Sequence, residues 1–203
     1  MARRLLPAAM AAVAVLSACD GRAERDRGAD AHDPRKQPGY IVDSIHPPEV
    51  ALHRFRQGIE PPALLDGSPT RDVLLSRFTS AVERRDADSL RALTLTRAEF
   101  AYIVYPESRL SKPPYRQPPD VTWMLLQAET GAGTQKLLNR AAAGLRPLSY
   151  RCPNPAEREG KLSITTGCVA RLHEAGAERE TRLFGRIVEY DGRWKFIALD
   201  GDL

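Results

Sequence analysis

The period of the apolar residues changes once along this 203-residue chain, and that change constrains the fold more than any other feature. From about residue 70 to residue 104, apolar residues recur every three or four positions, which is the spacing of one helix face. In the last third they alternate or form short runs between turn residues, as strands do. The order predicts an α+β domain in which short N-terminal helices pack on a curved C-terminal antiparallel sheet.

Capping residues mark the starts of the predicted helices. Thr70 is a candidate N-cap for a helix that runs to Asp86 with one buried face. A short helix follows from Asp88. Thr96, with Glu99 three residues later, has the capping-box pattern of a third helix. The helical part is therefore predicted to consist of several short helices.

Proline and glycine divide the middle of the chain. Five prolines fall within residues 106–120, and such a stretch indicates a long loop. An apolar segment follows over residues 121–126. Residues 134–143 have the pattern of one more short helix, which ends at Gly144, a residue type typical of the C′ position.

Four predicted strands make up the last third, over residues 162–164, 168–172, 181–190 and 193–199. Asp191-Gly192 is a strong signal for a two-residue hairpin turn. The final strand has apolar residues on both faces, so we expect it to be central in the sheet. The helix after Thr70 needs an apolar partner, and this hairpin offers one. The predicted core comprises Leu74, Phe78, Val82, Ile187, Trp194 and Phe196.

The N-terminus has the features of an export signal. Arg3 and Arg4 precede an apolar stretch over residues 5–16, which is too short to span a bilayer. Leu16-Ser17-Ala18-Cys19 then resembles the lipobox of bacterial lipoproteins. That resemblance implies a diacylglyceryl group on the Cys19 thiol, cleavage before this cysteine, and a lipid bilayer as the partner of the acylated residue. The alternatives are an ordinary secretory signal with an accidental cysteine and a twin-arginine signal.

This interpretation divides the chain into four predicted parts. We expect a signal peptide over residues 1–18, a flexible polar tether over residues 19–39, a short helical lead-in over residues 40–69 and the α+β domain over residues 70–203. The domain is expected in the cell envelope, outside the cytoplasm and on the periplasmic side. Asp20 resembles an inner-membrane retention signal, but the rule varies between lineages, so the choice of membrane stays open.

Two cysteines remain once Cys19 is assigned to lipid. An even pair in an oxidising compartment predicts a structural disulfide between Cys152 and Cys168. A metal pair or a redox dithiol is the alternative. The chain contains no CxxC motif, and no histidine is close to either cysteine in the sequence, so we expect the disulfide.

The arrangement of helices and strands resembles a nuclear-transport-factor-2-like domain. The resemblance rests on the helix after Thr70, the turn at residues 86–90, and the closing hairpin that ends in Gly192-Arg193-Trp194-Lys195-Phe196. It implies a cone-like α+β fold with a pocket. Residues 97–106, the cysteine pair and residues 183–187 are also similar to a group of uncharacterised bacterial lipoproteins. Neither resemblance implies a particular activity, because the cone fold hosts enzymes, binding modules and scaffolds.

Charge and histidine placement exclude several classes of function. The net charge of +4 comes from interspersed charges without a long basic run, so a nucleic-acid partner is not expected. His46 and His53 flank Glu49, but their spacing differs from that of HExxH. We therefore expect no metal and no cofactor. Trp123 and Trp194 are expected in the core.

Among the polar residues, Glu99, Tyr102 and Tyr105 are the set best suited to ligand binding or catalysis. Glu99 and Tyr102 are three residues apart and share one side of a helix. In a pocket they could hold a ligand, or Glu99 could act as a general base. In a structural role, Glu99 caps the helix and the tyrosines line the core edge. The sequence favours a non-catalytic module that binds a small ligand or an envelope protein; the alternative is a small hydrolase or isomerase that uses the Glu/Tyr pair.

Overall fold

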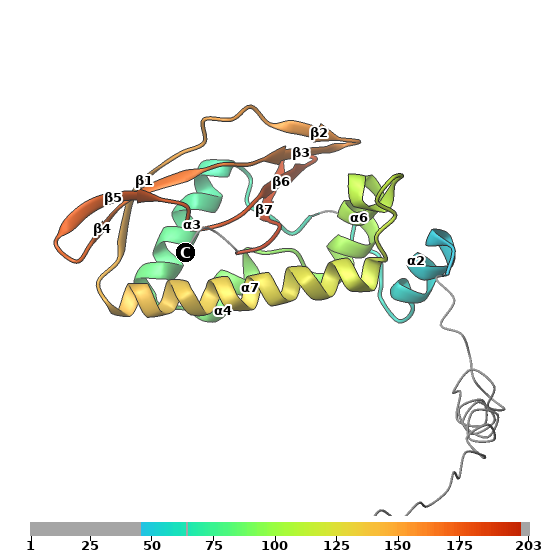
Figure 1. Ribbon diagram of the computed structural model, residues 1–203, viewed down its shortest axis with the longest axis horizontal. Coiled ribbons are helices and arrows are strands. Elements are labelled where there is room, and N and C mark those ends of the chain that lie inside the picture. The colour runs from blue at the N-terminus through green and yellow to red at the C-terminus, as the bar shows by residue number, and fades with distance from the viewer. Residues whose placement is uncertain (1–45, 64, 200–203) are drawn as a thin grey trace, which may run out of the picture. The chain divides into compact units, whose positions relative to one another are not determined.

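The computed structural model describes residues 46–63 and 65–199 (Figure 1). The predicted signal peptide, Cys19, the tether and the start of the lead-in lie outside the described residues. Helices precede strands along the chain, so the predicted α+β class is confirmed. In Figure 1 the long helix α7 runs along one edge, and α3 lies between it and the strands.

The helical part comprises α-helices interrupted by two short segments of other geometry. These are α2 (Pro48–Arg56), α3 (Arg71–Arg84), α4 (Ala87–Ala92), α5 (Arg97–Glu99), the π-helix η2 (Phe100–Val104), α6 (Tyr105–Glu107), the 3-10 helix η3 (Arg109–Ser111) and α7 (Pro119–Ala142). The predicted caps are present. Thr70 Oγ1 accepts a hydrogen bond from the Val73 N–H, and Thr96 and Glu99 form a complete capping box.

Helix α7 differs from the prediction of a short helix over residues 134–143. It starts at Pro119 and continues for 24 residues. Pro118 and Pro119 stand at its N-terminus, where the missing N–H and fixed φ of proline favour helix initiation. No proline follows before Ala142, and Gly133 is buried against the domain. Packing of this face outweighs the low helix propensity of glycine, about 1 kcal/mol per residue.

The strands form two antiparallel sheets rather than one. The first has the order β1-β4-β5, and the second has the order β2-β3-β6-β7. Their bounds are β1 (Arg146–Arg151), β2 (Glu157–Glu159), β3 (Leu162–Thr165), β4 (Val169–Glu174), β5 (Ala177–Thr181), β6 (Ile187–Tyr190) and β7 (Arg193–Phe196). The predicted strand over residues 181–190 is wrong, because the chain leaves the first sheet at Thr181 and enters the second at Ile187.

The closing hairpin forms at the predicted turn. Asp191 and Gly192 have φ values of 50° and 72°, and two positive values suit the type I′ turn that matches strand twist. Strand β7 was expected to be central, but it is the last strand of its sheet. Its outer edge instead pairs with single residues, Ser68 opposite Trp194 and Thr94 opposite Phe196. These two bridges cover part of the edge that β7 would otherwise expose.

The core around Phe78 matches the predicted one. The Phe78 ring lies 5.3 Å from that of Phe184 and 5.2 Å from that of Phe196, measured between centroids. Five of the six predicted core residues are fully buried, and Trp194 is half-buried and packs against them. A second apolar cluster surrounds Phe100 and contains Ile197 from the segment after β7. Residues 193–199 thus contribute to both clusters.

Two further links hold the first sheet. Cys152 and Cys168 lie at disulfide-bonding distance, with Sγ atoms 2.02 Å apart and Cα atoms 4.0 Å apart. Arg140 of α7 donates two hydrogen bonds to Glu174 at the end of β4, of 2.8 and 2.9 Å. These hydrogen bonds from the guanidinium hold the pKa of Glu174 below its ordinary value.

We predict that Phe78→Ala lowers the free energy of unfolding by about 3–5 kcal/mol, because it removes an aromatic ring from a closed core and leaves a cavity. Urea denaturation followed by circular dichroism measures the loss. Leu148→Ala is the matched control, since Leu148 is 49% exposed and its truncation should change stability by less than about 0.5 kcal/mol. Equal midpoints for Phe78→Ala and the wild type would contradict the packing.

Candidate functional site

The most buried charged groups of the described structure form one ion pair, Glu99 with Lys195. The Lys195 Nζ donates to Glu99 Oε2 at 2.8 Å, and the two side chains are only 1% and 3% exposed. Lys195 belongs to β7 and Glu99 to α5. The sequence placed Lys195 on a strand face but gave no sign of its partner. The signal that could have found it is a lysine within an otherwise apolar strand.

Both carboxylate oxygens of Glu99 are engaged by other donors as well. The Thr96 N–H donates to Oε2 at 2.7 Å, within the capping box. The Asp66 N–H donates to Oε1 at 2.6 Å. Glu99 therefore joins three parts of the chain: the segment before α3, the start of α5 and the last strand. An ionised carboxylate that accepts three such bonds is well suited to holding structure.

The tyrosines that the sequence grouped with Glu99 bond elsewhere. Tyr102 Oη donates to the Ile59 carbonyl at 3.0 Å, and the Arg56 guanidinium lies 4.4 Å from its ring centroid. Tyr105 Oη donates to the Gln117 carbonyl at 2.6 Å. Burial, and secondly the charge of Asp120, raises the pKa of Tyr105. Each of the three side chains is thus bonded to a different segment.

A small cavity lies beside Tyr105. Its volume is about 20 Å³, room for about one water molecule. The wall is mainly apolar and includes Phe100, Leu126 and Ile164. Glu99 does not line it. The cavity has no space for a substrate in this conformation.

A larger groove lies between the α4–α5 connection and α7. Its volume is about 420 Å³, within the range of small-ligand sites. Leu95 and Trp123 give it an apolar wall, and its polar lining includes Asp88, Arg91, Arg97 and Gln127. Trp123, predicted as a core residue, is half-buried, and its ring lies 5.3 Å from the Phe100 ring by centroid distance. Its ring therefore belongs to both the core edge and the groove.

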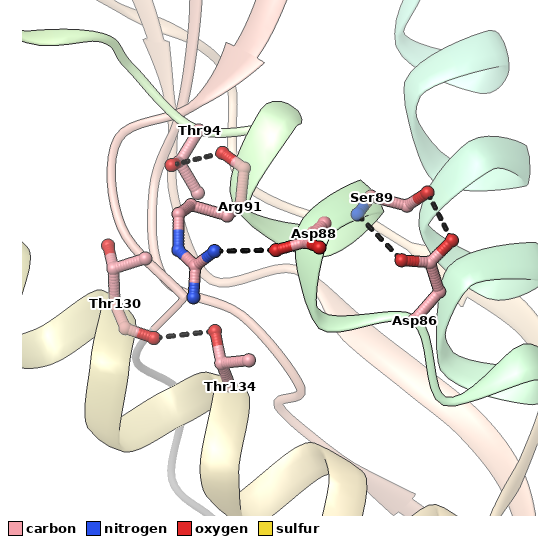
Figure 2. Close-up of polar contacts among 7 residues, drawn as sticks. All are labelled: Asp86, Asp88, Ser89, Arg91, Thr94, Thr130 and Thr134. Carbon is pink, nitrogen blue, oxygen red and sulfur yellow. Dashed lines mark hydrogen bonds and ion pairs between the residues drawn. The ribbon is translucent and has the colours of Figure 1, made fainter.

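The two arginines of the groove are exposed and held in different ways. Arg91 pairs with Asp88 at 2.7 Å, as Figure 2 shows, and its side chain extends from α4 toward α7. The same view shows Thr134 bonded to the carbonyl of Thr130, on the buried side of α7. The Arg97 guanidinium lies 4.7 Å from the Phe55 ring centroid.

This arrangement suits one kind of ligand. An indole can stack against a flat apolar group. Guanidinium groups bind carboxylate, sulfonate or phosphate oxygens, often through two hydrogen bonds. A ligand with an apolar body and an anionic end would satisfy both parts of the groove.

The histidines of the described residues do not form a metal site. His46 bonds with Arg54, and in residues 46–63 and 65–199 no three His, Cys, Asp or Glu side chains gather as metal ligands. Across this same part of the chain, no helix has the length and apolar character needed to cross a bilayer.

Comparison of the chain with protein families, with curated proteins and with solved structures found no match.

We predict that Lys195→Met lowers the free energy of unfolding by about 3–5 kcal/mol, because it leaves the buried Glu99 carboxylate without its counter-charge. The double variant Glu99→Gln/Lys195→Met should lose less than Lys195→Met alone, since it removes both charges. Urea denaturation of the three proteins measures this.

The matched control for this pair is Arg151→Met. Arg151 pairs with Glu180 at 3.0 Å, but both side chains are more than half exposed. An exposed pair contributes less than about 1 kcal/mol. If Lys195→Met changed stability no more than Arg151→Met, the buried pair would not have the structural role assigned here.

Proposed function

We propose that this protein is a lipoprotein of the cell envelope, anchored in a bilayer by acylated Cys19, with its folded domain outside the cytoplasm. The lipobox-like Leu16-Ser17-Ala18-Cys19 after an apolar stretch supports the anchor. The bonded Cys152–Cys168 pair supports an oxidising compartment, because such bonds persist there. The similarity to nuclear-transport-factor-2-like domains belongs to the same proposal and adds no activity.

We further propose that the domain binds a ligand rather than catalyses a reaction. The observation that carries this choice is the bonding of Glu99, the residue that the alternative enzyme hypothesis uses as a base. Its two oxygens accept bonds from Thr96, Asp66 and Lys195. Removal of a substrate proton by this carboxylate would require loss of bonds that join three segments.

The proposed ligand-binding site is the groove of Trp123, Arg91 and Arg97. Its ligand would be a small molecule with a flat or apolar body and a carboxylate, sulfonate or phosphate group. An envelope protein that presents an aromatic side chain beside an acidic one would satisfy the same chemistry.

We predict that Cys19→Ala abolishes incorporation of labelled fatty acid in growing cells and leaves the precursor uncleaved, because the acylated thiol is the substrate of the lipoprotein peptidase. Metabolic labelling followed by immunoprecipitation measures this. The double variant Cys152→Ala/Cys168→Ala is the control and should keep its label. Normal labelling of Cys19→Ala would refute the anchor.

We predict that Arg91→Gln/Arg97→Gln weakens binding of anilinonaphthalene sulfonate, an apolar anion, by about tenfold or more, because bonds to charged groups contribute about 1.5–3 kcal/mol. Fluorescence titration of the full protein measures the affinity. The control is Arg171→Gln, since Arg171 is an exposed arginine of β4. Equal affinity of the double variant and the control would contradict the groove as the binding site.

A further inference from the structure

The outward face of α7 is apolar in its first half. Val121, Met124 and Leu125 are 38%, 61% and 45% exposed. Residues three and four apart share one side of a helix, so these three lie together, and exposed Ala128 extends the same stripe. The buried residues of α7 follow a different register and face the domain: Pro119, Thr122, Leu126, Thr130, Gly133, Thr134 and Leu137.

Charge is sparse on this part of the helix. Between Val121 and Gln135 the sequence has a single charged residue, Glu129. A surface helix normally carries charged and polar residues opposite its buried face. Single exposed apolar residues are ordinary, whereas a contiguous stripe of them marks a contact surface. The α7 outer face, defined by Val121, Met124, Leu125 and Ala128, therefore needs an occupant.

We propose that this occupant is the surface of the bilayer in which Cys19 is anchored. The inference rests on the proposed lipid anchor. The described part of the chain begins at His46 and leads directly into α2, which packs against α7 (Figure 1). The segment from Cys19 to His46 can span at most about 95 Å at 3.5 Å per residue. The anchor thus keeps the domain within about 95 Å of one membrane, so the α7 outer face can reach that bilayer.

The segment just before α7 has the composition of a membrane-surface contact. Lys112, Tyr115 and Arg116 are exposed, and Tyr115 is 60% exposed. The Lys112 ammonium donates to the Glu107 carbonyl, a neutral acceptor, so its charge is not compensated by this bond. Asp120 is the acidic residue beside them. Basic residues attract anionic headgroups, and tyrosine favours the interface between headgroups and acyl chains.

The apolar stripe and this basic, aromatic segment together resemble an interfacial contact, in which a helix lies in the plane of the membrane surface. The acyl chains at Cys19 would supply the stable attachment. The α7 outer face would then fix the orientation of the domain on the bilayer and determine which of its surfaces face away from it.

The test uses the mature protein, produced in cells with its own signal peptide and reconstituted in vesicles of phosphatidylethanolamine and phosphatidylglycerol. Met124→Cys introduces the one thiol that is neither acylated nor paired, and it is labelled with nitrobenzoxadiazole. Nitroxide-labelled lipid in the vesicles should quench the dye by about twofold or more, since quenching requires contact with the bilayer surface. A dye at Glu178→Cys, an exposed position of β5, should keep its emission.

A second pair of variants tests the apolar stripe itself. Leu125→Asp in the Met124→Cys background should abolish most of the quenching. Leu148→Asp is the matched control and should leave it unchanged, because Leu148 is equally apolar and similarly exposed but lies on β1.

Each outcome has one meaning. Co-flotation with vesicles and quenching at position 124 support the proposal. Co-flotation without quenching overturns docking and leaves the lipid anchor intact. A blue-shifted dye that lipid nitroxides do not quench, and whose shift grows with protein density, assigns the α7 outer face to a second copy and overturns membrane docking. Failure to float overturns the lipid anchor, and the tethered docking with it.

Discussion

The buried pair of Glu99 and Lys195 is the interaction on which the arrangement of this domain depends. Removing two charges from water is costly, and the cost is offset only when every partner is in place. Here the partners come from three segments, since Glu99 also accepts bonds from Asp66 and Thr96. The position of α5, the path of the segment before α3 and the register of β7 are therefore fixed together.

Strand β7 contributes side chains both to this polar pair and to the apolar core. Phe196 points into the cluster of Phe78, while Lys195, one residue earlier, points to the opposite side and reaches Glu99. A shift of one residue would exchange the two side chains, placing a charge in the aromatic cluster and a phenyl ring at the carboxylate. The polar pair thus gives the strand a register that apolar packing alone would leave less well defined, since Lys195 and Phe196 are both buried on opposite faces.

Because both carboxylate oxygens of Glu99 are bonded within the fold, the candidate binding surfaces lie at the exterior of the domain. The groove at Trp123 and the α7 outer face lie on the same helix but use different sides of it. Residues of the groove combine an indole with two arginines, and the α7 outer face is almost free of charge. The first suits a ligand with an anionic group, and the second suits an apolar boundary. A domain oriented by α7 on a membrane would hold its groove at a defined height above that surface.

The sequence by itself determined the features that depend on residues close in the chain. The capping residues Thr70 and Thr96, the turn at Asp191-Gly192 and the α+β order all follow from signals a few residues long. Only the tertiary structure decided the division into two sheets, the full length of α7 and the burial of Lys195. The physical reason is distance: Lys195 finds its counter-charge 96 residues away, and no local pattern encodes such a partner.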